Sequence, residues 1–134
     1  MTSATDWSQA PVRALAYLGD AVYELHVRGL ALREAAAQVE ALHKATVARV
    51  SAPSQAQLAQ RLLPHLSEQE AAIFRRGRNH KGASGPRHAS AHDYRLSTAL
   101  EAVLGYVYLT QDGDRLAALL ALTDHLMEDT PDAP

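Results

Sequence analysis

Residues 93–110 read DYRLSTALEAVLGYVYLT, and this stretch indicates the class of fold that the chain adopts. From Leu96 to Leu109 its residues are apolar on almost every face of a helix, which is typical of a helix buried in a protein core. Glu101 is the only ionisable residue in that span apart from the tyrosines. The stretch therefore predicts a central helix that carries a single acid into the interior.

The segments around this helix also have the apolar spacing and the boundary residues of helices. Gly29 marks a point where the first of them can bend or split, and Ser67 with Glu70 has the spacing of a capping box. No alternation of apolar and polar residues persists, so we expect an all-α bundle of six or seven helices. Besides residues 93–110, the expected helices cover residues 10–36, 38–50, 51–63, 67–76 and 114–129.

Composition places the chain among small single-domain proteins. It has 134 residues, of which 47% are hydrophobic, and we expect one domain at residues 10–128 between flexible ends at 1–9 and 129–134. The absence of cysteine excludes disulfides and thiolate metal sites. The first ten residues lack the basic start of a signal peptide, and no apolar run reaches the roughly 18 residues of a membrane span. We therefore expect a soluble cytoplasmic protein.

Basic residues are concentrated in one segment of a chain whose formal net charge is −2. Six of the thirteen lysines and arginines lie at 75–95, where Asp93 is the only acid. Within it, residues 77–91 are rich in glycine and serine, which predicts a loop of about 15 residues, a length typical of functional loops. Such a segment can bind the phosphates of RNA or DNA, and the alternative is a solvated loop whose arginines pair with acids elsewhere. The candidate phosphate-binding residues are Arg75, Arg76, Arg78, Asn79, Lys81, Arg87 and Arg95, and His80, His88 and His92 lie among them.

A second acid, Asp20, lies in an apolar helix without a local cation. In residues 14–24, ALAYLGDAVYE, no lysine or arginine stands within four positions of Asp20, and none stands three or four positions from Glu101. Each acid alone is compatible with an ion pair to an arginine of another helix or with a helix N-terminus. Two such acids that converge in one small core can instead share a divalent cation, and oxygen ligands without cysteine favour Mg²⁺ or Mn²⁺. Glu24, one turn after Asp20, is a candidate third ligand, although an ion pair with Arg28 is the favoured alternative.

An acid pair beside a phosphate-binding segment is the layout of a metal-dependent nuclease, in which the cation activates water against a phosphodiester. Two alternatives stay open at this point. The first is a non-catalytic helical module that binds RNA through the basic segment 75–95. The second is a structural helical dimer whose acids form ion pairs.

Four motifs of the chain resemble the ribonuclease III family. Residues 18–22, LGDAV, are similar to the core of its signature segment, and residues 101–105, EAVLG, to its second acidic helix. Residues 75–79, RRGRN, and 94–102, YRLSTALEA, resemble the Mini-ribonuclease III branch, which consists of the nuclease domain alone. The motifs occur in the family's order, and the resemblance covers roughly residues 10–128.

This resemblance implies the all-α ribonuclease III endonuclease fold and a homodimer that takes double-stranded RNA. It implies that Asp20 and Glu101 hold Mg²⁺, for which Mn²⁺ can substitute, and that the metal orients and deprotonates the attacking water. The products would carry 5′-phosphate and 3′-hydroxyl ends. The branch further implies maturation of the large-subunit (23S) ribosomal RNA precursor, and a ribosomal protein is a candidate for presenting that substrate.

The resemblance departs from the larger members of the family at two acidic positions. Four residues before Asp20 the larger enzymes carry an acid, and this chain has Ala16. Three residues before Glu101 they carry another, and this chain has Thr98, which can offer only a neutral hydroxyl. The resemblance therefore implies one Mg²⁺ per subunit rather than a two-metal site.

Overall fold

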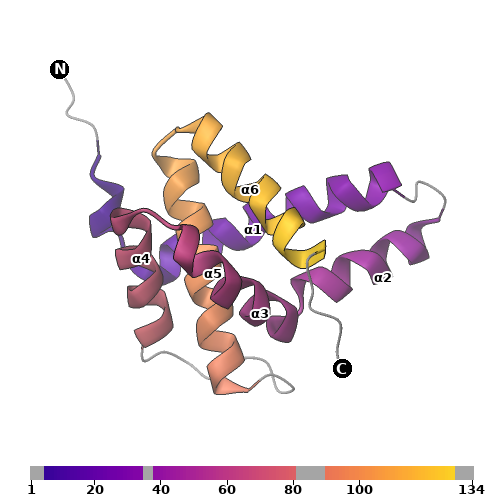
Figure 1. Cartoon of the computed structure of the whole chain (residues 1–134), viewed down its shortest axis with the longest axis horizontal. Helices are drawn as coiled ribbons and strands as arrows, with labels where there is room; N and C mark the ends of the chain where they lie inside the picture. The colour runs from indigo at the N-terminus through magenta and orange to yellow at the C-terminus, as the bar shows by residue number, and fades with distance from the viewer. Residues whose placement is uncertain (1–4, 35–37, 81–89, 129–134) are drawn as a thin grey trace.

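The computed structural model describes residues 5–34, 38–80 and 90–128, and within them the chain is helical (Figure 1). No strand occurs in these ranges, which agrees with the predicted all-α bundle. Short 3₁₀ turns at Trp7–Gln9 (η1) and Leu63–His65 (η2) accompany the α-helices of the described residues. These helices are α1 (Val12–Glu34), α2 (Val39–Val50), α3 (Ala52–Leu62), α4 (Glu68–Asn79), α5 (Ala91–Leu109) and α6 (Gly113–Glu128).

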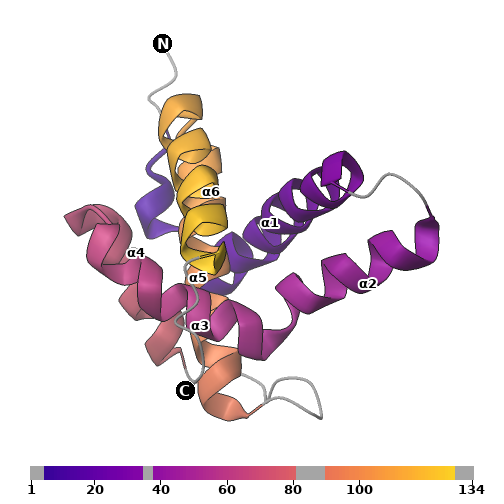
Figure 2. The ribbon, with the colours of Figure 1, turned by 45° about the vertical axis from the view of Figure 1, so that its right-hand side comes forward.

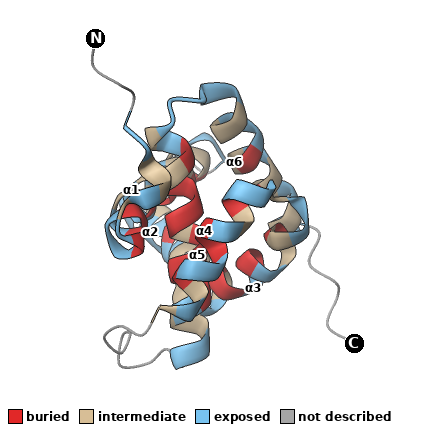
Figure 3. Cartoon of the chain, turned by 90° about the vertical axis from the view of Figure 1, so that its left-hand side faces the viewer, coloured by how far each residue is buried: buried red, intermediate tan, exposed pale blue. Residues whose placement is uncertain are grey.

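The predicted central helix is α5, and α1, α3, α4 and α6 pack against it. α1, α3 and α4 make the larger contacts with it, and α6 makes a smaller one. Leu100, Val103 and Leu104 of α5 are fully buried, and Figure 3 shows the buried positions gathered around this helix. Because burial of one leucine side chain contributes about 1.5–3 kcal/mol, α5 and the helices against it form the core that positions the site.

Two glycines allow α1 and α5 to approach each other along their backbones. A Cβ atom at Gly19 would overlap the backbone carbonyl of Glu101, and one at Gly105 would overlap the carbonyl of Leu15. Helices with larger side chains at their crossing stay about 8–10 Å apart, and this pair can come closer because neither glycine has a side chain. The crossing places Asp20, the residue after Gly19, beside Glu101 of α5.

The first helix does not split at Gly29, where the sequence allowed a bend or a split. α1 runs as one helix from Val12 to Glu34. A glycine in a helix interior costs about 1 kcal/mol relative to alanine. Val27 and Ala31, on either side of this glycine, are buried against the rest of the protein. The packing of the helix therefore outweighs the local preference for a break.

α4 extends three residues past its predicted end at residue 76, to Asn79. Gly77 was expected to begin the loop, yet it is buried within the helix, where a Cβ atom would lie 2.8 Å from the Cα atom of Ala99. Contact with α5 therefore keeps the last turn of α4 helical. Arg78 and Asn79 belong to this helix and not to the predicted loop.

Glu70 joins the start of α4 to α6. The predicted capping box is present, since the Glu70 backbone N–H donates to Ser67 Oγ at 3.1 Å and the Ser67 N–H donates to Glu70 Oε1 at 2.9 Å. Arg115 of α6 donates to the same carboxylate from Nη2 at 2.7 Å and from Nε at 2.9 Å. Hydrogen bonds from Arg115 hold the pKa of Glu70 below its usual value.

α1 and α2 extend together beyond the other helices, as Figure 2 shows. Asp124 of α6 ties this pair to the bundle, because it accepts from His26 Nε2 at 2.9 Å and from Arg49 Nη2 at 3.0 Å. In the part of the chain that the structure describes, no helix has the length and apolar character needed to cross a membrane.

Candidate metal and active site

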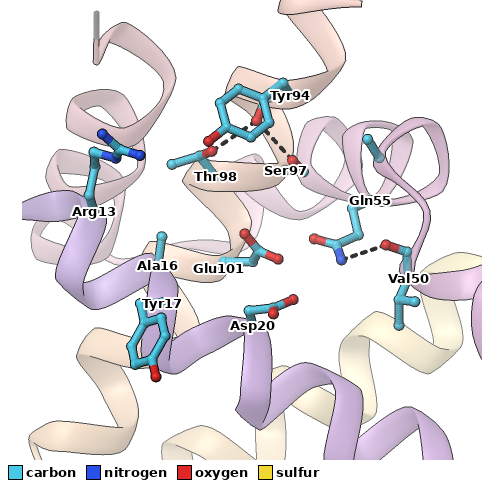
Figure 4. Close-up of a pocket in the computed structure, with 11 residues that line it drawn as sticks. Arg13, Ala16, Tyr17, Asp20, Val50, Gln55, Tyr94, Ser97, Thr98 and Glu101 are labelled. Atoms are coloured by element: carbon cyan, nitrogen blue, oxygen red, sulfur yellow. Dashed lines mark hydrogen bonds between the residues drawn. The ribbon is translucent and has the colours of Figure 1, made fainter. Parts of the chain in front are cut away.

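A pocket of about 430 Å³ lies where α1, α3 and α5 meet (Figure 4). Both predicted acids, Asp20 and Glu101, line it. The other lining residues are Arg13, Ala16 and Tyr17 of α1, Val50, Ala52 and Gln55 at the junction of α2 and α3, and Tyr94, Ser97 and Thr98 of α5. The two acids were predicted to converge, and the structure brings them together.

The two carboxylates influence one another directly. The pKa of Glu101 is raised from 4.5 to about 9, first by burial and then by the hydrogen bond to Asp20 and the negative charge of Asp20. Glu101 is the more enclosed of the two, and Asp20 lies toward solvent. Glu101 therefore holds a proton at neutral pH when no cation is bound.

The structure does not support the alternative that each acid forms an ion pair with an arginine of another helix. Within the described residues, neither Asp20 nor Glu101 forms a salt bridge with a lysine or arginine. Arginine pairs elsewhere in the described ranges involve other acids, such as Glu70 and Asp124. The pair is therefore an anionic site that faces a solvent-connected pocket.

Glu24 is not among the residues that line this pocket. The predicted ion pair with Arg28, which was favoured over a role as third ligand, is present. The Oε2 atom of Glu24 is 3.1 Å from Arg28 Nη2, in an ion pair one helical turn apart. No cluster of three or more aspartate, glutamate, histidine or cysteine side chains that could hold a metal occurs in the described ranges. Among the residues that the structure describes, the charged oxygen donors that line the candidate metal site are thus Asp20 and Glu101.

The two positions that depart from the larger family members both line the pocket. Ala16 contributes only a methyl group to it. Thr98 contributes a hydroxyl, and that hydroxyl donates to the Tyr94 carbonyl at 2.9 Å. Ser97 donates to the same carbonyl at 2.8 Å. The Thr98 oxygen can still accept a hydrogen bond, but it adds no charge to the site.

Gln55 is a member of the site that the sequence analysis did not identify. It comes from α3, is 2% exposed, and lines the pocket together with both acids. A glutamine is not titratable, so a search for acids and cations passes over it. The only available signal was a polar residue beside the apolar positions Ala56, Leu58 and Ala59, all of which are buried.

The basic residues that the structure describes lie where α4 ends and α5 begins. Figure 1 shows both of these helix ends at the same end of the molecule. Arg75 and Arg95 are exposed, and Arg78 is partly exposed. Arg76 is engaged within the chain, because its guanidinium donates to the Ser8 carbonyl at 2.6 Å and to the Ala10 carbonyl at 2.7 Å.

Two of the predicted phosphate contacts, Lys81 and Arg87, lie outside the described residues, as does His88. Asn79 is exposed at the end of α4, where its Oδ1 atom accepts from Arg78 Nε at 3.4 Å. Arg95 follows Tyr94, a lining residue of the pocket. The basic end of the molecule therefore adjoins the pocket at Tyr94.

The donor set of the pocket fits a hard divalent cation. Two carboxylates, hydroxyl oxygens and a buried amide oxygen face it, no sulfur atom is among the lining residues, and the chain has no cysteine. Mg²⁺ and Mn²⁺ prefer such oxygen ligands and keep several waters when the protein supplies few. The residues that would hold the cation are Asp20 and Glu101.

Comparison with known proteins relates both the sequence and the fold to one family. The model of the Ribonuclease III domain family matches residues 13–112. A Mini-ribonuclease 3 of Gloeobacter violaceus is 49% identical over 92% of this chain and 90% of that protein. A Mini-ribonuclease 3 of Symbiobacterium thermophilum is 41% identical over 88% of this chain and 91% of that protein. A crystal structure of a Fusobacterium nucleatum protein superposes with a TM-score of 0.78 at 28% identity, covering 87% of this chain and 93% of that one.

These matches span both acids and nearly the whole described fold, so they apply to the chain as a domain and not to one motif. The chain therefore belongs to the ribonuclease III domain family, among the Mini-ribonuclease 3 proteins, and is classed with them as an endoribonuclease.

Proposed function

We propose that the protein is a Mg²⁺-dependent endoribonuclease for double-stranded RNA, with Asp20 and Glu101 as its metal-binding and catalytic acids. The observation that carries this proposal is the acid pair itself. The two carboxylates face one pocket, burial and the neighbouring Asp20 raise the pKa of Glu101, and no lysine or arginine of the described residues forms a salt bridge with either acid. Membership of the ribonuclease III family supports the reaction class.

The bound cation would act as a Lewis acid that activates water and stabilises the charge that develops on the phosphodiester. Glu101 must lose its proton for both carboxylates to hold the cation, so metal binding releases a proton and weakens as the pH falls. In the hydrolysis, the water oxygen forms a bond to phosphorus while the bond to the 3′ oxygen breaks. The leaving 3′ oxygen takes up a proton, which yields a 3′-hydroxyl end and a 5′-phosphate end.

The basic end of the molecule is the proposed contact surface for the RNA backbone. Arg75, Arg78, Asn79 and Arg95 are described there, and Lys81 and Arg87 belong to the same proposed surface. Duplex RNA is recognised mostly through its shape, its phosphates and its 2′-hydroxyls. We therefore expect binding with little base specificity from these residues and with strong dependence on salt.

A homodimer is part of the proposal, with each subunit cutting one strand. Apolar side chains on the outer side of α1 support it, because Tyr17 is 85% exposed, Leu25 is 75% exposed and Leu32 is 54% exposed. Their spacing of eight and seven residues puts them on one side of the helix. Several large apolar side chains exposed on one side of a helix are typical of protein interfaces. Tyr17 also lines the pocket, so a partner copy on this face would lie next to the acid pair.

The proposed physiological substrate is the precursor of large-subunit (23S) ribosomal RNA, processed in the cytoplasm. This part of the proposal rests on the resemblance of residues 75–79 and 94–102 to the Mini-ribonuclease III branch and on the similarity to proteins of that name. A ribosomal protein is a candidate for presenting the stem that is cut. Cleavage of a precursor stem with and without ribosomal proteins tests this point separately from the chemistry.

Incubation with end-labelled duplex RNA tests the proposed activity. The wild-type protein is expected to cut the duplex with Mg²⁺, to leave it intact with EDTA, and to produce 5′-phosphate ends. Asp20→Asn is expected to bind the duplex and leave it intact in both conditions, with an unchanged circular dichroism spectrum. Intact duplex under all conditions, together with binding, would instead support the non-catalytic RNA-binding module.

A further inference from the structure

In the side-chain amide of Gln55, the nitrogen has a hydrogen-bond partner among the described residues and the oxygen has none. Its Nε2 atom donates to the backbone carbonyl of Val50 at 3.0 Å. Its Oε1 atom is buried and has no hydrogen-bond partner among the described residues. Burial of an acceptor without a partner is unfavourable, and such atoms are rare in folded proteins.

Rotation of the Gln55 amide does not remove this problem. A rotated side chain would point Oε1 at the Val50 carbonyl, which would bring two acceptors together without a proton between them. The carbonyl of Val50, at the end of α2, therefore determines which way the amide faces. The oxygen is left on the side of the pocket where Glu101 lies, as Figure 4 shows.

Gln55 brings a further oxygen atom to the pocket that Asp20 and Glu101 line. Asp20, Glu101 and Gln55 come from α1, α5 and α3, so their oxygens approach the pocket from three helices. The amide N–H group of Gln55 is close enough to Glu101 to lower the pKa of that carboxyl by hydrogen bonding, against the larger effects of burial and of Asp20, which raise it. Ala16 and Thr98, which occupy the two positions where the larger enzymes carry acids, add no charged oxygen.

We propose that Gln55 Oε1 is a neutral oxygen ligand of the divalent cation held by Asp20 and Glu101. An amide oxygen is a hard donor of the kind that Mg²⁺ and Mn²⁺ accept, and it adds no negative charge to a pair whose carboxylates already repel each other. Binding of the cation gives the buried oxygen the partner that it lacks. The inference rests on the proposed metal-dependent function, and it assigns α3 a direct part in the site.

Two variants of Gln55 separate the oxygen from the rest of the side chain. Gln55→Met and Gln55→Glu both lose the hydrogen bond to the Val50 carbonyl, but only the glutamate retains a side-chain oxygen. Gln60→Met is the matched control, because Gln60 is an exposed glutamine on the same helix. Binding of Mn²⁺ is measured for each protein by electron paramagnetic resonance of the free ion, without RNA.

Loss of one metal ligand or of its support commonly lowers metal affinity about 10- to 100-fold. We expect Gln55→Met to weaken Mn²⁺ binding by about that factor, and Gln55→Glu and Gln60→Met to bind at least as tightly as the wild type. Equal affinity of Gln55→Met and wild type would overturn the assignment. An equal loss in Gln55→Met and Gln55→Glu would overturn it too, because the hydrogen bond to Val50 would then be the cause.

A measurement on the unaltered protein covers the case in which a variant does not fold. The side-chain carbonyl carbon of Gln55 is expected to shift in the nuclear magnetic resonance spectrum as Mg²⁺ is added, while that of Gln60 stays constant. An unchanged Gln55 resonance in a protein that binds Mg²⁺ and cleaves RNA overturns the inference and leaves the proposed function standing. A wild-type protein that binds neither Mn²⁺ nor Mg²⁺ overturns both.

Discussion

Replacement of Glu101 by glutamine is expected to stabilise the metal-free protein while it removes cleavage. The pKa of Glu101 is about 9 in the folded protein, against 4.5 for the unperturbed group. A raised pKa means that the folded protein binds a proton that the unfolded chain has released. The stability of the folded state therefore falls as the pH rises from 4.5 toward 9. Glutamine is neutral in both states, so it does not show this loss.

The size of the effect follows from the difference between the two pKa values. One pKa unit corresponds to about 1.4 kcal/mol. A pH of 7 lies about 2.5 units above the pKa of 4.5 that Glu101 has in the unfolded chain. The substitution should therefore add about 3 kcal/mol to the free energy of unfolding at this pH. At pH 5 the same relation predicts that the substitution adds about 1 kcal/mol to the free energy of unfolding. The gain should therefore grow with pH across this range.

Urea unfolding followed by circular dichroism, in EDTA at pH 5, 7 and 8, measures this gain. Glu24→Gln is the control, because Glu24 sits in an exposed ion pair with Arg28, and such pairs contribute about 0.3–0.5 kcal/mol. Addition of Mg²⁺ should stabilise the wild type and leave Glu101→Gln unchanged, since a ligand stabilises only the state that binds it. A Glu101→Gln protein that is no more stable than wild type at pH 7, or whose gain does not grow with pH, would refute the reasoning.

Two further predictions concern charges outside the acid pair. Arg115→Met removes the hydrogen bonds that lower the pKa of Glu70, and should cost about 1–2 kcal/mol at pH 7. Because a lowered pKa stabilises the folded state only above the unfolded value of 4.5, this cost should shrink at pH 3, and an equal cost at both pH values in urea unfolding would contradict it. Arg75→Glu with Arg78→Glu should weaken duplex RNA binding at least about tenfold and reduce the salt dependence, whereas Arg33→Glu, at the exposed end of α1, should not. Filter binding at several salt concentrations measures both, and an unchanged affinity of the double variant would argue against the basic surface.

Local sequence signals were least dependable at glycines. From the sequence, Gly29 was interpreted as a helix breaker and Gly77 as the start of a loop, but both lie inside helices. At Gly77 the missing side chain lets α4 lie against Ala99 of α5, so the same residue that weakens a helix in isolation makes its packing closer. Such a contact joins residues far apart in the chain, and no local window of sequence contains both sides of it.

The sequence by itself determined the class of fold and the two acids of the candidate site. Helical spacing is a local property, so an apolar helix with one unpaired acid could be recognised at Asp20 and at Glu101 from their neighbours alone. Only the tertiary structure decided how the acids meet and what else faces them. Gly19 allows the close crossing that brings them together, and α3 delivers the buried oxygen of Gln55 to the same pocket. Both depend on how three helices pack, which is set by burial across the whole core and not by spacing within any one of them.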